Sequence, residues 1–261
     1  MPLDKAPYWT DLYYDIIENY FWAPQTIGRK SAGPSHPWNF WKKKLESQEV
    51  PLNHMLNLFF HIVPQELLDI SVSALLTRDM SGMEIVIPKE GTIGGNITQP
   101  DIIFRNESSL VFVEMKVDSK SSIDQFTKYA IAALLLTREE PKLSSVDLVM
   151  LGRQDVHQKI WNDADQLSLC DEQSVRSVAL RGLNENPSIW KEKGVQRHLK
   201  EHPEDLGPLS DQVGSMGLHL ASYTTLAAVL KEYAAAEKTV DRLIAGILNE
   251  FEVRQLTASR S

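Results

Sequence analysis

The stretch "QPDIIFRNESSLVFVEMK" (residues 99–116) decides how the rest of this chain is interpreted. Two apolar runs flank the polar segment "RNESS", a pattern typical of two antiparallel strands joined by a hairpin. Asp101 precedes the first run, and Glu114 and Lys116 close the second. Burying a charge costs on the order of several kcal/mol unless the charge is paired or bound to a metal ion. These three charges therefore need an explanation.

The two faces of the second strand differ in character. Residues two apart on a strand share a face. In the run 110–117, one face holds an aromatic residue and two charges, namely Phe112, Glu114 and Lys116. The other face is apolar throughout and holds Val111, Val113, Met115 and Val117. A helix predicted over 121–139 is expected to cover the charged face. A carboxylate and an ammonium group would then lie at the edge of a packed layer.

Strand and helix patterns surround this hairpin. Strands are predicted over 83–88, 100–104, 110–117, 145–152 and 218–223, and helices over 51–77 with a break at Pro64, over 121–139 and from 224 onward. The helix 121–139 would return the chain through a right-handed crossover, which makes the strand 145–152 parallel to its neighbour. The expected fold is α/β, a sandwich of helices around a central mixed sheet.

The whole chain, 1–261, is expected to form a single domain around this sheet. Its parts are a helical N-terminal region (1–63), a core with the charged hairpin (64–152), a helical insertion (153–212) and a last strand with C-terminal helices (213–261).

Composition limits the class of protein. The single cysteine, Cys170, excludes an internal disulfide and a four-cysteine iron–sulfur cluster. No signal-peptide pattern opens the chain, and no apolar run approaches the roughly 18–20 residues of a membrane span. A cytoplasmic protein without a membrane partner is expected. The net charge of −8 disfavours nucleic acid as a partner unless a local basic patch or bound metal ions offset it.

The hairpin brings its charges to one end. If the turn closes near "NESS", Asp101 at the start of one strand lies beside Glu114 and Lys116 at the end of the next. Two carboxylates with a lysine at adjacent strand ends form an oxygen-rich site suited to Mg²⁺ or Mn²⁺. A solvated surface pair is the alternative for Glu114 and Lys116 taken alone.

These residues resemble the PD-(D/E)xK nuclease superfamily, whose fold is restriction-endonuclease-like. The resemblance rests on Pro100-Asp101, on Glu114-Met115-Lys116 in the next strand, and on the order of strands and helices around them. The following helix carries Gln125-x-x-x-Tyr129, similar to the Q-x-x-x-Y signature of the RecB-like and lambda-exonuclease-like branch. The resemblance covers roughly residues 64–152 and the strand and helix at 218–235.

The resemblance implies a role for each matching residue. Asp101 and Glu114 would bind the divalent metal, Mg²⁺ or Mn²⁺, with the backbone carbonyl of Met115 as a further ligand. Lys116 would position the attacking water or help deprotonate it. Gln125 and Tyr129 are four residues apart, so they share one face of a helix. They would orient Lys116 or contact a substrate phosphate.

The superfamily also uses an acidic residue from an upstream helix. In this chain the choice is open between Glu66, Asp69 one turn later, and Glu84 at the start of a strand, and Glu66 is favoured as a metal ligand.

The expected function is metal-dependent hydrolysis of phosphodiester bonds, with DNA as the expected nucleic acid. The alternative is a catalytically inactive protein of the same fold that acts as a nucleic-acid-binding or assembly module. The sequence leaves the oligomeric state open, a homo-oligomer included.

Overall fold

The computed structural model describes most of the chain. The described residues are 8–17, 45, 48–86, 97–117, 123–153, 172–190 and 192–257.

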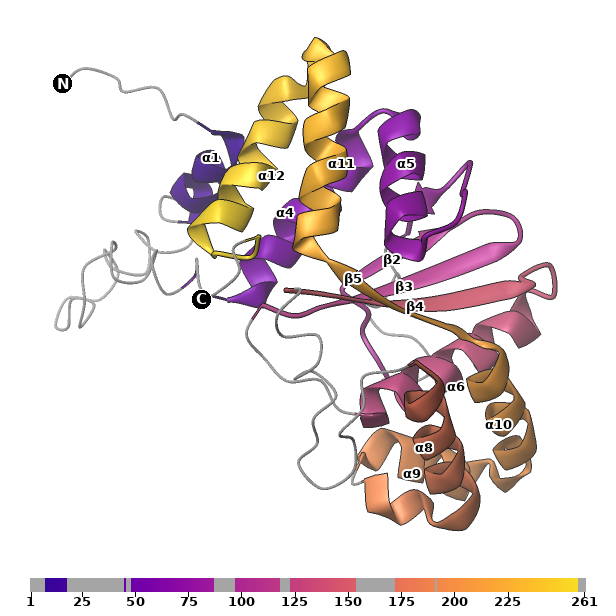
Figure 1. Cartoon of the computed structure of the whole chain (residues 1–261). Helices are drawn as coiled ribbons and strands as arrows, with labels where there is room; N and C mark the ends of the chain where they lie inside the picture. Colours follow the sequence, from indigo (N-terminus) through magenta and orange to yellow (C-terminus); the bar gives the residue numbers. More distant parts are fainter. Residues whose placement is uncertain are drawn as a thin grey trace, which may run out of the picture.

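A five-stranded mixed sheet forms the centre of the molecule (Figure 1). Its strands, which lie in the order of the sequence, are β1 (Glu84–Ile85), β2 (Ile102–Arg105), β3 (Ser109–Met115), β4 (Ser145–Gly152) and β5 (Gly217–Ser222). β2 is antiparallel to both of its neighbours, β1 and β3, and β3, β4 and β5 are parallel. The carboxyl ends of β3, β4 and β5 therefore meet at one edge of the sheet.

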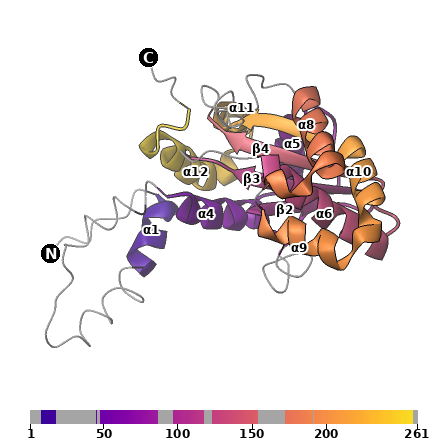
Figure 2. The same ribbon diagram turned by 90° about the horizontal axis from the view of Figure 1, so that it is seen from below.

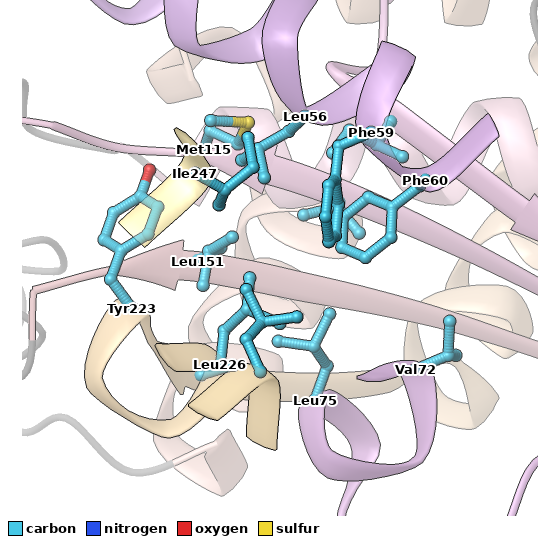
Figure 3. Close-up of a cluster of buried hydrophobic side chains, with 14 of the residues drawn as sticks. Leu56, Phe59, Phe60, Val72, Leu75, Met115, Leu151, Tyr223, Leu226 and Ile247 are labelled. Carbon is cyan, nitrogen blue, oxygen red and sulfur yellow. The ribbon is translucent and has the colours of Figure 1, made fainter. Parts of the chain in front are cut away.

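One face of the sheet is covered by helices from both ends of the chain (Figure 1). These are α1 (Trp9–Ile16), α4 (Glu49–Ile62), α5 (Gln65–Leu76), α11 (Tyr223–Ala236) and α12 (Asp241–Val253). Phe59 and Phe60 of α4 pack edge to face, and Phe60 packs in the same way on Phe104 of β2. Figure 3 shows this core, in which Met115 and Leu151 of the sheet lie among side chains of the covering helices.

The opposite face is covered by helices from the middle of the chain. They are α6 (Ile123–Glu139), α8 (Glu172–Glu185), α9 (Lys193–Glu201) and α10 (Leu206–Ser215), with short 3-10 turns at Pro187–Trp190 and Pro203–Asp205. Figure 2 shows these four helices grouped together, apart from α1 and α12. Phe112 of β3 packs against Tyr129 of α6, with ring centroids 5.3 Å apart.

The predicted division of β3 into two faces is confirmed. The side chains of Val111, Val113, Met115 and Val117 join the core beneath α4, α5 and α11, whereas Phe112 joins the core beneath α6. The mixed sheet and the parallel return of β4 are confirmed as well. In the predicted helical insertion, 153–212, the described residues form α8, α9 and the start of α10, and residues 154–171 lie outside the described residues. Among the described residues, no helix is long and apolar enough to cross a membrane.

One element boundary differs from the prediction. The first strand is expected over 83–88, but β1 covers Glu84 and Ile85, with a further hydrogen bond of 2.8 Å from the Val86 N–H to the Ile103 carbonyl, and residues 87–96 lie outside the described residues. The C-terminal segment, predicted as a long helix or a helical pair, is two helices, α11 and α12, with a 3-10 turn at Lys238–Val240 between them. The break at Pro64 is confirmed, because Pro64 caps the start of α5.

Candidate active site

The register of β2 and β3 sets the position of the first candidate residue. Ile102 lies across from Val113, so the next position outward places Asp101 across from Glu114. The Asp101 carboxylate leaves the strand pairing and accepts a hydrogen bond from the backbone N–H of Met115, 2.7 Å from its Oδ2. The predicted neighbourhood of Asp101 and the end of β3 is therefore confirmed.

Pro100 explains why the ladder stops here. One residue further along the same register, Pro100 lies across from Met115. Met115, like the other odd-numbered residues of β3, directs its backbone N–H and its backbone C=O toward β2. Proline has no N–H, so the ladder offers no donor to the Met115 carbonyl at this rung. The N–H and C=O of one strand residue point the same way, and the N–H of Met115 reaches Asp101. The Met115 carbonyl oxygen is thus aimed at the side of the Asp101 carboxylate.

Glu114 is the centre of the hydrogen-bonded cluster. Its Oε1 accepts from Lys116 Nζ at 2.6 Å and from Gln125 Nε2 at 2.9 Å, and its Oε2 accepts from the Tyr129 hydroxyl at 2.5 Å. Glu114 and Lys116 are only 8% and 7% exposed. Gln125 and Tyr129 lie one turn apart on α6, so the helix that covers this face supplies both neutral donors. All four residues predicted around Asp101 are therefore brought together.

Helix α4 supports the same cluster from the other side of the sheet. The amide of Asn53 donates to Asp101 Oδ1, and that of Asn57 donates to the Asp101 backbone carbonyl, both at 2.8 Å. Glu49 Oε1 accepts from the Val117 N–H at 3.1 Å, and its Oε2 lies 4.0 Å from Lys116 Nζ. Residues four apart line one face of a helix, so the spacing Glu49, Asn53, Asn57 was the available signal.

The upstream acidic residue at the site is Glu49, which sequence reasoning missed. The structure does not bring Glu66 there: its carboxylate accepts a 3.5 Å bond from Tyr233 of α11. The apolar residues of α5, Leu67 and Leu68 among them, face the sheet and leave Glu66 exposed. The other two candidates also lie elsewhere. Asp69 accepts from the backbone N–H groups of residues 82 and 83, and Glu84 is an exposed residue of β1.

The close approach of carboxylates shifts the pKa values of the residues in this cluster. Burial and the negative charge of Glu114 raise the pKa of Asp101 from 3.8 to about 7, against the opposing effects of the Met115 N–H and Lys116. Burial lowers the pKa of Lys116, but the charge and hydrogen bond of Glu114 outweigh it and the pKa is raised. Burial, followed by the Glu114 charge, raises the pKa of Tyr129 well above its ordinary value. Lys116 is accordingly a cation, and Tyr129 is a neutral donor.

Tyr223 adds a polar group that lacks a partner. It is the first residue of α11, immediately after β5, and its side chain is completely buried. Its hydroxyl has no hydrogen-bond partner among the described residues. Burial, together with the charges of Glu49 and Asp101, raises the pKa of Tyr223, so this hydroxyl lies within electrostatic reach of the site. In Figure 3 the hydroxyl points away from Leu226, on the side of Met115.

The oxygen donors at this edge suit a hard divalent cation. Within the described ranges, no group of three or more histidine, cysteine, aspartate and glutamate side chains is arranged to hold a metal ion. The available donors instead combine two carboxylates, Asp101 and Glu114, with the Met115 carbonyl, which are ligand types that Mg²⁺ and Mn²⁺ prefer. Repulsion between the two carboxylates would be relieved by a cation.

Comparison of the chain with protein family models, with curated proteins and with solved structures gives no match. Function is therefore argued from the site and its chemistry.

Proposed function

We propose that this protein is a divalent-metal-dependent nuclease of restriction-endonuclease-like fold that hydrolyses phosphodiester bonds in DNA. One observation carries the proposal: Glu114 is hydrogen-bonded at once to Lys116, Gln125 and Tyr129, and Asp101 lies across from it in the hairpin. A surface ion pair would not need two further donors from a covering helix. The antiparallel hairpin followed by a crossover to parallel β4 also agrees with the proposed fold.

The metal would be held by Asp101, Glu114 and the Met115 carbonyl, with Glu49 able to bind through a water molecule. A bound Mg²⁺ or Mn²⁺ would lower the pKa of a coordinated water and stabilise charge on the phosphate oxygens. The raised pKa of Asp101 means that protons compete with the metal for this carboxylate near neutral pH.

Beside the metal, the side chains of the site would stabilise the transition state and orient the two carboxylates. Lys116, protonated and anchored on Glu114, would place its positive charge where negative charge develops on the phosphate in the transition state. Gln125 and Tyr129 hold the Glu114 carboxylate in one orientation from two sides. Asn53 does the same for Asp101. The site is thus preorganised, and little rearrangement is needed when substrate arrives.

A non-catalytic nucleic-acid-binding or assembly module on the same scaffold is the second candidate. The observation in its favour is that both Glu114 oxygens already accept protein hydrogen bonds, on a chain with a net charge of −8. A module of this kind would keep the hydrogen-bonded cluster as a structural element, without metal binding.

The test of the proposed function is a cleavage assay with purified protein. Linear, circular, single-stranded and duplex DNA would be incubated with Mg²⁺, Mn²⁺ or EDTA. We expect cleavage that requires the metal and falls at least about 100-fold in Lys116→Ala, because the lost cation acts on transition-state charge. Lys142→Ala, at an exposed lysine in a turn, is the matched control and should cleave normally.

Binding of Mn²⁺, measured by calorimetry, separates the two candidates. An enzyme should bind the ion and lose binding in Asp101→Asn. A protein that neither binds Mn²⁺ nor cuts any of the DNA forms is the module, and the nuclease proposal is then wrong.

A further inference from the structure

A pocket of about 550 Å³ opens beside Asp101, between α4 and the start of β2. This volume is within the range of roughly 300–1,000 Å³ that is typical of small-molecule sites. Its wall on the helix side includes His54, Asn57, Leu58 and His61, and Gln99 and Asp101 contribute from the chain that leads into β2. Because Asp101 belongs to both the pocket and the candidate metal site, an occupant of the pocket would lie next to the reacting phosphate.

The described part of the pocket is not built to hold a phosphate. Among the described residues that line it, none is a lysine or an arginine, and a proposed metal-binding carboxylate forms part of the wall. Phosphate groups are bound by lysine, arginine or the N-terminus of a helix, and a carboxylate repels them. The pocket therefore suits an uncharged part of the substrate.

The side chains in the pocket match the surface of a nucleobase. His54 and His61 are seven residues apart on the exposed side of α4, with Leu58 between them. A hydrogen bond of 2.9 Å joins His54 Nδ1 to the Tyr13 hydroxyl, and this contact holds one imidazole in place. Bases splayed out of a helix stack on flat rings such as histidine.

Amide groups supply the polar edge of the pocket. Asn57 uses its amide nitrogen on Asn53 and on the Asp101 carbonyl, which fixes the direction of the remaining side-chain oxygen. Gln99 is exposed on the opposite wall. Amide side chains pair with the donor and acceptor atoms along a base edge. Flat rings, a leucine and three amides around one cavity fit a base better than they fit a sugar or a peptide.

We propose that this pocket receives one unpaired nucleobase, adjacent to the phosphate that the proposed metal ion beside Asp101 would bind. The inference rests on the proposed nuclease function and specifies its substrate: single strands, frayed ends or flaps rather than fully paired duplex. A base inside a duplex is stacked and paired, and it reaches such a pocket only after it is taken out of the stack, which costs a few kcal/mol.

The experiment measures binding, so it does not depend on cleavage. Fluorescence anisotropy would follow a labelled short oligodeoxynucleotide, the same strand with abasic sites throughout, and the paired duplex. Ca²⁺ would replace Mg²⁺ so that no strand is cut. We expect the strand with bases to bind at least about tenfold more tightly than the abasic strand, as expected for one stacked base.

Variants of α4 locate the effect. Leu58→Glu places a charged carboxylate in the pocket and should remove the preference for bases, and His61→Ala should weaken it. Ile62→Glu, one turn further on the same helix and outside the lining, adds the same charge and is the control: Ile62 and Leu58 are 52% and 46% exposed. Circular dichroism would verify that each variant is folded, which we expect because these positions are exposed.

The outcomes of the two proposals are distinguishable. Equal binding of the abasic strand, or a preference that survives in Leu58→Glu, overturns the nucleobase pocket even if the protein cuts DNA. A preference for bases in a protein that never cleaves supports the pocket and removes only the nuclease function.

Discussion

At the scale of single residues, Asp101 shows how the site works against stability. Its pKa in the folded protein is about 7, above the ordinary 3.8, because it is buried beside Glu114. The folded state therefore holds a proton that the unfolded state releases between these values. The contribution of Asp101 to the free energy of unfolding is therefore greatest below about pH 4 and falls as the pH rises toward 7, by up to about 1.4 kcal/mol per pH unit.

This effect predicts a pH dependence for the metal-free protein. Between pH 5 and pH 8 in EDTA, the urea midpoint of the wild type should fall, since Asp101 must ionise in a buried place. Asp101→Asn removes the titrating group, so its midpoint should change less over the same range. Equal slopes in the two proteins would contradict the assignment of the raised pKa to Asp101.

Residues of the site differ in how far the sequence predicts them. Asp101, Glu114, Lys116, Gln125 and Tyr129 follow from strand alternation, helix spacing and the resemblance, because all lie within one hairpin and the helix after it. Glu49 does not, because it reaches Lys116 from a helix more than sixty residues upstream. Which face of that helix meets the sheet depends on the packing of α4 against β2, and local patterns do not contain this packing.

At the scale of elements, α12 is attached to α1 by a buried polar contact. Arg254, at the end of α12, pairs with Glu250, and its Nη2 donates to the Tyr14 hydroxyl at 2.8 Å. The Arg254 and Glu250 side chains are 0% and 3% exposed. Removing one partner of such a pair leaves an uncompensated charge in the interior.

Arg254→Ala should therefore destabilise the protein by about 3–5 kcal/mol, measured as the free energy of unfolding in urea. Lys238→Ala is the control, because its ion pair with Asp241 is exposed and 3.9 Å long, and it should change stability by less than about 1 kcal/mol. A loss in Arg254→Ala as small as that of the control would show that α12 does not depend on this contact.

The elements themselves are largely predictable from the sequence. β3, α6 and β4 have strong periodicity and are built mostly from neighbouring segments. β1 is predicted longer than the pairing that is described, because its apolar run indicates a strand without indicating how much of the run pairs with β2. The sequence pattern of α11 and α12 is continuous, so the 3-10 turn between them was not resolved from periodicity alone.

At the scale of the whole molecule, each end of the sheet holds a carboxylate with a shifted pKa, and the two shifts are in opposite directions. At the amino end of β4, Asp147 accepts from Arg78 Nη2 at 2.6 Å and from Ser145 at 3.1 Å, and it pairs with His219 of β5 at 2.9 Å. Burial raises the pKa of Asp147, but these partners outweigh it and the pKa is lowered. This carboxylate stabilises the fold at neutral pH, unlike Asp101.

Asp147→Asn should reduce the free energy of unfolding by about 1–3 kcal/mol at pH 7, since it weakens hydrogen bonds to a charged group. The difference from the wild type should shrink below about pH 4, where the carboxylate of the unfolded chain becomes protonated. Metal-dependent cleavage should persist, because Asp147 lies at the far end of the sheet from the site. Loss of cleavage in a folded Asp147→Asn protein would show that the two ends are coupled.

Pro100, which ends the ladder between β2 and β3, has a consequence for strand alignment. A hairpin can slip by two residues and keep every side chain on its proper face. Such a slip would place Pro100 across from Val113, where the ladder requires an N–H that proline lacks. In the native alignment the missing donor falls at the outermost rung, opposite Met115, whereas the competing alignment interrupts the ladder at an inner rung, at a cost of about 1 kcal/mol. The proline thus acts as a stop against misalignment, and it places Asp101 opposite Glu114 each time the chain folds.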